Sequence, residues 1–137
     1  MHALYTAHAT AHGGRDGRVA SSDGLLDLVL TPPKELGGKG GSPNPEMLFA
    51  AGYAGCFQSA MQFVARMQKI AAPASTVTAD VSIGKQGEGF ALAVKLNVSL
   101  PGMDKAAAEA LVATAHKVCP YSNATRNNIP VELTVTT

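Results

Sequence analysis

The sequence has 137 residues and a net charge of +1, with Lys and Arg scattered along it, which disfavours nucleic acid or an anionic membrane surface as a partner. It is 46% hydrophobic but only 5% aromatic, so we expect one domain over residues 1–137 with a core of Ala, Val and Leu. The N-terminus lacks the basic start and continuous apolar run of a signal peptide, so a cytoplasmic location is expected. In a reducing compartment the two cysteines favour catalytic, redox or metal chemistry over a structural disulfide.

The first third of the chain alternates with the two-residue period of β-strands. Residues 3–12 place Ala and Tyr side chains on one face and Thr and His side chains on the other. A glycine-rich turn at 13–18 follows, and two further strands are predicted at 19–22 and 26–30. We therefore predict a three-stranded meander that ends at the Pro-Pro pair 32–33.

The longest apolar helical pattern runs from 44 to 69 and carries the thiol of Cys56 near its middle. Asn44 suits the N-cap, Pro45 suits the first helical position, and Pro73 is expected to close the helix. Counting by three and four residues gives one apolar stripe, which consists of Phe49, Tyr53, Cys56, Ala60, Phe63 and Met67. Cys56 is therefore expected to face the core or an interface.

A membrane-spanning alternative exists for the same helix. Residues 47–65 carry no charge and are long enough to cross a bilayer. The opposite face carries Gln58 and Gln62, however, and the stretch contains two glycines. These features disfavour a transmembrane helix.

The second half of the chain predicts a β-hairpin, a helix and a final strand. Residues 77–83 and 90–100 alternate with one apolar face and are joined by a glycine-rich turn. Strong helix formers at 105–118 predict a second helix, whose inward stripe includes Cys119, and residues 129–135 alternate as a last strand. Antiparallel strands covered by two main helices predict an α+β fold.

Each predicted helix thus presents one thiol inward, and the two thiols meet only if both helices pack on the same side of the sheet. A disulfide requires the two Cα atoms to lie within about 7 Å, a distance that the sequence does not give. Burial of Cys56 disfavours its thiolate, so a reactive Cys56 requires a neighbouring cation. Arg15 and Arg18 are the candidates, because a guanidinium stays protonated and its fork can hold both a thiolate and a peroxide oxygen. The plain alternative is a solvated arginine in a hairpin turn.

Five blocks of sequence resemble the OsmC/Ohr family, which includes the organic hydroperoxide resistance proteins, and the likeness covers nearly the whole chain. The block VCPYSNATRNNI at 118–129 is specific to the Ohr branch, although Asn127 stands where Gly is usual. The other blocks are ALYTAHATAHGGRDGR (3–18), SSDGLLDLVL (21–30), KELGGKGGSPNPEMLFAAGYAGCF (34–57) and LPGMDKAAAEALV (100–112).

The resemblance implies an OsmC-like fold and a thiol peroxidase that uses no metal or other cofactor. By motif, Cys56 is the peroxidatic thiol and Cys119 the resolving thiol, while Arg15 and Glu46 hold and activate the thiolate. The implied partners are organic hydroperoxides, a second copy in an intertwined homodimer, and dihydrolipoamide on lipoylated proteins as reductant. Four aromatic side chains either line a pocket for an alkyl or acyl tail or form ordinary core, namely Phe49, Tyr53, Phe57 and Phe63.

Helix geometry bears on two of these implied roles. Glu46 and Cys56 are ten residues apart, about 15 Å along an unbroken helix. Either one of the two intervening glycines breaks the helix, or Arg15 and Glu46 reach Cys56 from the second subunit, which we favour. Cys119 is expected at a helix C-terminus, where the negative dipole end opposes a thiolate and suits a resolving thiol. A new helical turn that begins at Pro120 would weaken this second argument.

Three alternatives differ in class from the peroxidase. A cysteine hydrolase or acyl carrier would pair Cys56 with His116, but it leaves Cys119 as packing only. A zinc site would combine Cys119 and His116 with Cys56 and a distant His, so its ligands are scattered. A non-catalytic redox-sensing or ligand-binding dimer would use the same thiols without turnover, and catalytic peroxide consumption with a dithiol separates it from an enzyme.

Overall fold

In the computed structural model, which describes residues 1–71 and 74–137, the chain forms two compact units. The first unit is Met1–Leu48 and the second is Phe49–Thr137. The prediction that Pro73 closes the long helix lies outside the described residues.

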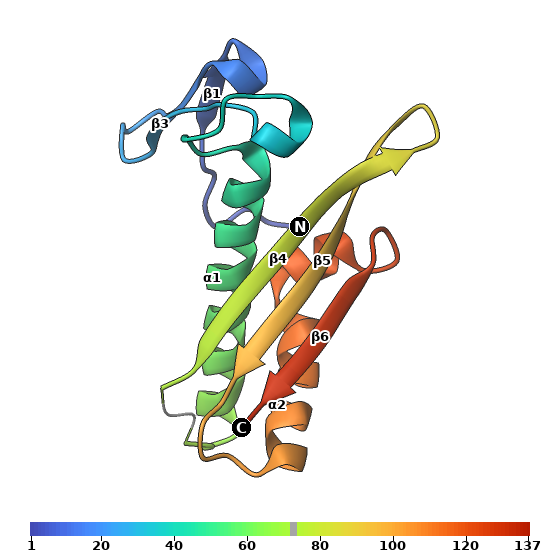
Figure 1. The fold of residues 1–137 in the computed structure, drawn as a ribbon. Coiled ribbons are helices and arrows are strands. Elements are labelled where there is room, and N and C mark those ends of the chain that lie inside the picture. Colours follow the sequence, from blue (N-terminus) through green and yellow to red (C-terminus); the bar gives the residue numbers. More distant parts are fainter. Residues whose placement is uncertain (72–73) are drawn as a thin grey trace. The chain divides into compact units, whose positions relative to one another are not determined.

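The first unit contains the predicted three-stranded meander (Figure 1). Its strands pair antiparallel in the order β1-β2-β3, with Ala11 opposite Val19 and Val19 opposite Leu28. The turn between β1 and β2 uses positive φ angles at Gly13 and Gly14, which glycine adopts without strain. The first strand is shorter than predicted, since only its last four residues pair. The strands are β1 (Ala9–His12), β2 (Arg18–Ser21) and β3 (Asp27–Val29), and short 3-10 turns lie at Gly14–Asp16 and Lys34–Leu36.

Helix α1 (Pro45–Met67) begins where the sequence predicts. The Asn44 Oδ1 atom accepts a hydrogen bond from the Met47 backbone N–H at 2.9 Å, which satisfies one of the free N–H groups of the first turn. The helix continues without interruption through Gly52 and Gly55. The alternative that one of these glycines breaks the helix is therefore wrong.

The buried face of α1 differs from the predicted stripe. Phe63 is 52% exposed and Met67 is 69% exposed, so the prediction that both face inward is wrong. Because each residue turns the helix by about 100°, Phe63 lies about 120° around the axis from Phe57, which is fully buried. The side chains that α1 does bury are Tyr53, Phe57, Ala60, Met61, Val64 and Ala65.

The second unit contains a three-stranded sheet in the order β4-β5-β6. Strands β4 (Thr76–Gln86) and β5 (Gly89–Ser99) form the predicted antiparallel hairpin, with Val81 opposite Val94. Strand β6 (Val131–Thr136) pairs parallel to β5, with Val94 opposite Val131. The expectation of purely antiparallel strands is wrong for β6, because a helical crossover after β5 returns the chain in the same direction.

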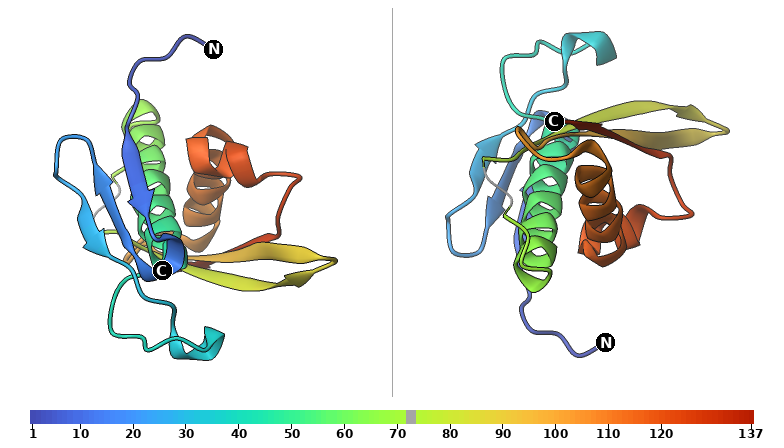
Figure 2. Two further views of the ribbon diagram at one scale, coloured as in Figure 1. Left: turned by 90° about the horizontal axis from the view of Figure 1, so that it is seen from above. Right: turned by 90° about the horizontal axis from the view of Figure 1, so that it is seen from below.

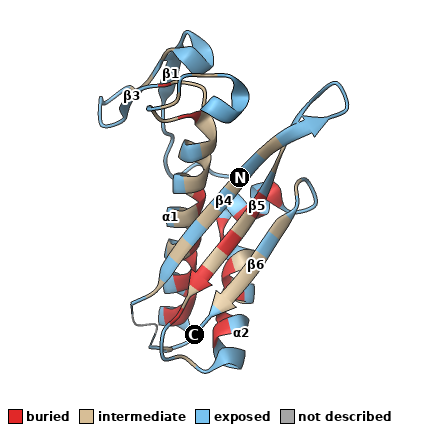
Figure 3. Ribbon diagram, viewed as in Figure 1, coloured by how far each residue is buried: buried red, intermediate tan, exposed pale blue. Residues whose placement is uncertain are grey.

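Two helices form that crossover. Helix α2 (Lys105–Val118) has the predicted bounds, and the Asp104 side chain caps it by accepting from the Ala107 N–H. A third helix, α3 (Pro120–Thr125), starts directly after Cys119, which is its N-cap residue. This is the new helical turn at Pro120 that the sequence analysis considered, and it weakens the argument that a helix C-terminus alone disfavours a Cys119 thiolate. Both α1 and α2 cover the same face of the β4-β5-β6 sheet (Figure 2). The core lies between these helices and β5, where alternate residues from Val94 to Leu100 are buried (Figure 3).

Candidate active site

The structure brings the two thiols together. The Cys56 Sγ on α1 and the Cys119 Sγ at the joint between α2 and α3 are 3.5 Å apart, and both thiols are free. Cys56 is half-buried, whereas Cys119 is fully enclosed. A disulfide bond has an S–S distance of about 2.05 Å, so the two sulfurs must approach by about a further 1.5 Å to form one.

The surroundings of Cys56 within its own unit favour the neutral thiol. Burial raises the pKa of Cys56, and the neighbouring Cys119 thiol adds to this effect. A hydrogen bond from the Tyr121 backbone N–H lowers the pKa of Cys56, but its effect is smaller than that of burial. An efficient nucleophile at this position therefore needs an additional positive charge.

Arg15 and Glu46 form a bidentate ion pair within the first unit. The two terminal guanidinium nitrogens of Arg15 donate to the two carboxylate oxygens of Glu46 at 2.8 and 2.5 Å. This contact lowers the pKa of the Glu46 carboxyl and raises the pKa of Arg15, because each charge stabilises the other. The Arg15 side chain is 43% exposed and Glu46 only 13%. The pairing leaves part of the Arg15 donor fork free for another acceptor.

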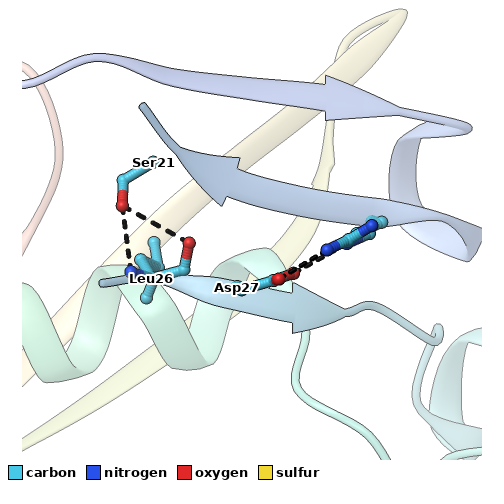
Figure 4. A network of polar contacts seen from close by, with 4 residues as sticks. Ser21, Leu26 and Asp27 are labelled. Atoms are coloured by element: carbon cyan, nitrogen blue, oxygen red, sulfur yellow. Dashed lines mark hydrogen bonds and ion pairs between the residues drawn. The ribbon is translucent and has the colours of Figure 1, made fainter. Parts of the chain in front are cut away.

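The other arginine candidate, Arg18, is engaged on the meander itself. Its Nε donates to the Asp27 carboxylate at 2.7 Å across the β2–β3 pair, and both side chains are exposed. Figure 4 shows this contact at Asp27, together with Ser21, whose hydroxyl accepts from the Leu26 N–H at 2.9 Å. Arg18 is thus exposed, as the alternative of a solvated arginine predicts, but it forms an ion pair across two strands.

Tyr121 is a site residue that the sequence analysis missed. Besides its N–H contact with Cys56, its ring packs against Phe49 and Tyr53, with centroids 6.3 and 5.7 Å apart. Gly52 makes room for this ring, since a Cβ atom there would lie 2.9 Å from the Tyr121 hydroxyl oxygen. Tyr121 lies two residues after Cys119, and the start of α3 at Pro120 is what turns it towards α1.

The four aromatic residues predicted to bind substrate fall into three different environments. Tyr53 and Phe57 are 0% exposed and belong to the core cluster. Phe49 is half-buried at the edge of that cluster and makes an edge-to-face contact with Tyr53. Phe63 is exposed on another face of α1, as described above. Phe49 and Tyr121 therefore offer the accessible aromatic surface near the thiols.

His116 does not pair with Cys56 as a cysteine hydrolase would require. Its Nδ1 atom bonds to the Ser122 hydroxyl at 2.8 Å, and burial lowers the pKa of its ring. Within residues 1–71 and 74–137, no three His, Cys, Asp or Glu side chains gather closely enough to hold a metal ion. None of the helices in the described part of the chain combines the length and apolarity needed to span a membrane.

Comparison with protein families matches residues 38–134 of this chain to the family described as OsmC-like protein. A curated relative from Xanthomonas axonopodis pv. citri, named organic hydroperoxide resistance protein, is 56% identical over 134 residues, which cover 96% of this chain and 94% of the relative. The Bacillus subtilis organic hydroperoxide resistance protein OhrA is 47% identical over 136 residues, covering 96% of each chain.

Solved structures are similar over the whole chain. The crystal structure of an organic hydroperoxide resistance protein from Legionella pneumophila matches with a TM-score of 0.97 and 54% identity, covering 99% of this chain and 100% of the other. A putative organic hydroperoxide resistance protein from Vibrio cholerae, solved with captopril bound in one of its active sites, matches with a TM-score of 0.94 and 49% identity, covering 98% of this chain and 94% of the other.

Proposed function

Because the chain belongs to the OsmC/Ohr family of organic hydroperoxide resistance proteins, we propose that it is a cysteine-based peroxidase that reduces alkyl and fatty-acid hydroperoxides to alcohols. The observation that carries the proposal is the 3.5 Å separation of the Cys56 and Cys119 sulfurs. Two free thiols at this distance can store the two electrons that reduction of one peroxide bond consumes.

The proposed reaction has three steps. The Cys56 thiolate attacks the outer oxygen of the hydroperoxide, so an S–O bond forms, the O–O bond breaks and the alkoxide takes a proton to leave as the alcohol. The Cys119 thiol then attacks the sulfur of the Cys56 sulfenic acid, which forms the S–S bond and releases water. A dithiol reductant finally restores both cysteines by two exchange reactions.

Arg15 and Glu46 are proposed to supply the positive charge that Cys56 lacks in its own unit. The guanidinium stabilises the thiolate and orients the peroxide, while Glu46 fixes the orientation of Arg15 through the bidentate contact. Because α1 is unbroken, Glu46 and Cys56 are separated by about 15 Å along its axis. We therefore propose that the Arg15–Glu46 pair of one protomer serves Cys56 of its partner in a homodimer.

Exposed apolar side chains support a second copy of the chain as the partner. Leu25 is 89% exposed in the first unit, and Met67 and Phe90 are 69% and 68% exposed in the second. Contiguous apolar surface is typical of sites that another chain covers, and these side chains are available to such a surface. A homodimer would bury them and complete each active site.

The organic substrate and the reductant are proposed from the site and the family together. The half-buried ring of Phe49 and the accessible ring of Tyr121 provide apolar surface for an alkyl or acyl tail near Cys56. A dithiol such as dihydrolipoamide on lipoylated proteins suits the disulfide, because its second thiol completes the exchange within one molecule. We place this cycle in the cytoplasm, where reduced thiols are the resting state.

Steady-state turnover tests the proposed function. The chain should consume many equivalents of tert-butyl hydroperoxide in the presence of dihydrolipoamide. The Cys56→Ser variant should lose this activity completely, whereas Cys119→Ser should complete the first oxidation to the sulfenic acid without forming an internal disulfide. One equivalent of peroxide consumed without turnover would instead indicate a redox sensor, and activity retained by Cys56→Ser would overturn the assignment.

A further inference from the structure

A network of four polar side chains, three buried and one partly buried, connects α1 to the helices on either side of Cys119. The Tyr53 hydroxyl contacts the Ser122 hydroxyl at 2.9 Å and the Thr125 hydroxyl at 3.0 Å, and Ser122 also contacts His116 Nδ1 at 2.8 Å. Tyr53 and Ser122 are 0% exposed and Thr125 is 3% exposed. Buried hydroxyl groups are costly unless they are paired, so this arrangement constrains the positions of the three helices that supply it.

Three members of the network lie three residues from a cysteine, about one helical turn. Tyr53 precedes Cys56 by three residues on α1. His116 precedes Cys119 by three residues, at the end of α2, and Ser122 follows Cys119 by three residues on α3. The network therefore ties the helix that carries one thiol to both sides of the joint that carries the other.

One assignment of hydrogen-bond donors and acceptors satisfies every contact of the network. The Thr125 hydroxyl donates to the Ser122 carbonyl at 3.2 Å, so its oxygen accepts from Tyr53. The Tyr53 oxygen then accepts from Ser122, and the Ser122 oxygen accepts from His116. This order requires the His116 proton on Nδ1. Burial lowers the pKa of His116, so the ring is a neutral donor at pH 7.

The joint at Cys119 needs such a constraint because it is a change of direction in the backbone. Cys119 has φ −63° and ψ 125°, an extended conformation between the end of α2 and the start of α3. Pro120 fixes φ at the first residue of α3. The Tyr121 ring packs on α1 on one side of this joint, and the side-chain network adds directional hydrogen bonds from α1 to α3 and on to the end of α2.

We propose that the Tyr53–Ser122–Thr125–His116 network positions the resolving thiol, holding Cys119 at the distance from Cys56 at which disulfide closure is fast. This role rests on the proposed peroxidase function and concerns only its second step, in which the S–S bond replaces the S–O bond of the sulfenic acid and water leaves. Slow closure would leave the sulfenic acid open to a second peroxide, which oxidises it irreversibly to sulfinic acid.

The first test is the Ser122→Ala variant, which removes the centre of the network. Peroxide should oxidise Cys56 at the parent rate, while disulfide closure should slow about tenfold, the effect of losing one or two buried hydrogen bonds. Sulfenic acid should then be trapped by dimedone, and mass spectrometry should detect sulfinic acid at lower peroxide doses than in the parent. The matched control is Thr134→Val, which removes a hydroxyl that donates to Asn97 Oδ1 at 2.6 Å on the sheet. Disulfide closure in this control variant should occur at the parent rate.

A second pair of variants separates positioning from general loosening. The His116→Asn variant retains a side-chain N–H donor near the place of Nδ1, whereas His116→Leu does not. Closure should therefore be nearly normal in His116→Asn and slow in His116→Leu. Equal closure rates in these two variants, or a parent closure rate in Ser122→Ala, would overturn the positioning role.

A measurement without peroxide keeps this inference separate from the proposed function. Equilibration in a glutathione redox buffer measures the stability of the Cys56–Cys119 disulfide, expressed as the effective concentration of Cys119 at Cys56. This effective concentration should be lower in Ser122→Ala than in the parent. A tenfold decrease in it corresponds to a reduction potential about 30 mV higher than that of the parent. An unchanged potential would count against the network. Failure of the parent Cys56 to react with any hydroperoxide would count against the peroxidase and leave this result standing.

Discussion

At Cys56, burial and charge act in opposite directions. Burial raises the pKa of the thiol, and the single N–H contact from Tyr121 does not offset it. A full positive charge is the remaining way to favour the thiolate, and Arg15 is the candidate whose donor fork is already oriented. Its partner Glu46 fixes that orientation only while it is ionised, so the proposed site would depend on pH through this pair.

The Arg15–Glu46 pair should make stability depend on pH in a defined direction. The folded chain lowers the pKa of Glu46. The contribution of the pair to the free energy of unfolding is therefore fully present above the unfolded glutamate pKa of about 4.3, and it is lost as pH falls through the lower pKa of the folded state. Glu46→Gln should cost at most about 1 kcal/mol at pH 7, since the half-exposed Arg15 is screened by solvent. Urea unfolding at pH 7 and at successively lower pH measures this difference.

The matched control for that prediction is Glu35→Gln, which changes an exposed glutamate of the same unit. The free energy difference between the parent and Glu46→Gln should shrink towards zero in acid, while Glu35→Gln should follow the parent at every pH. The same pH dependence in both variants would show that the contact between Arg15 and Glu46 does not stabilise the fold.

At the scale of elements, the sequence predicts the features that depend on neighbouring residues, such as where a helix begins. The caps at Asn44 and Asp104 mark the helix starts correctly, because each supplies a side-chain oxygen to a free N–H group. The parallel direction of β6 is not predictable in this way, since alternation fixes which face is buried but not which way the strand runs. Phe63 was misassigned because apolar side chains occupy more than one face of α1, so the pattern does not decide which face is buried, and the buried face centres on the side of Phe57.

The candidate site shows the same division between local and long-range information. The sequence motifs single out Cys56, Cys119, Arg15 and Glu46, and the structure joins them into two pairs. The distance between the sulfurs depends on how two helices pack over one sheet, which no local pattern specifies. Tyr121 was missed because its position follows from α3, a helix of six residues too short to give a periodic signal.

The two glycines of α1 provide a test of how α3 packs against it. Replacing an exposed helix glycine with Ala should stabilise the chain by about 0.5–1 kcal/mol. Gly55→Ala should show that gain, because nothing lies within 4 Å of its added Cβ. Gly52→Ala should gain less or destabilise, because its Cβ would lie 2.9 Å from the Tyr121 hydroxyl oxygen. Thermal unfolding of both variants measures the difference, and equal gains would contradict the close packing of Tyr121 on α1.

At the scale of the whole molecule, the proposed site requires two chains. The unbroken α1 separates Glu46 from Cys56 along its length, and a single copy leaves large apolar side chains exposed in both units. Both observations favour a homodimer in which each protomer supplies the thiols of one site and the arginine of the other. Sequence motifs alone identify the residues of such a site but not the chain from which each comes.

Mixed dimers test the arrangement across two chains. Cys56→Ser and Arg15→Ala protomers should each be inactive as homodimers. Co-expressed in equal amounts, they should recover about a quarter of the parent activity, because half of the dimers are mixed and each mixed dimer has one intact site. Peroxidase turnover of the purified mixture gives the result. An arrangement within one chain predicts no recovery at all, since neither protomer then carries a complete site.

The central claim, that Cys56 and Cys119 form one redox pair, is tested most directly by counting free thiols after a single oxidation. One equivalent of tert-butyl hydroperoxide should remove both thiols of the chain, and peptide mapping should identify a Cys56–Cys119 disulfide within one protomer. Dihydrolipoamide added afterwards should restore both thiols. Persistence of both thiols after the peroxide, or a disulfide between protomers in place of the internal one, would contradict the account.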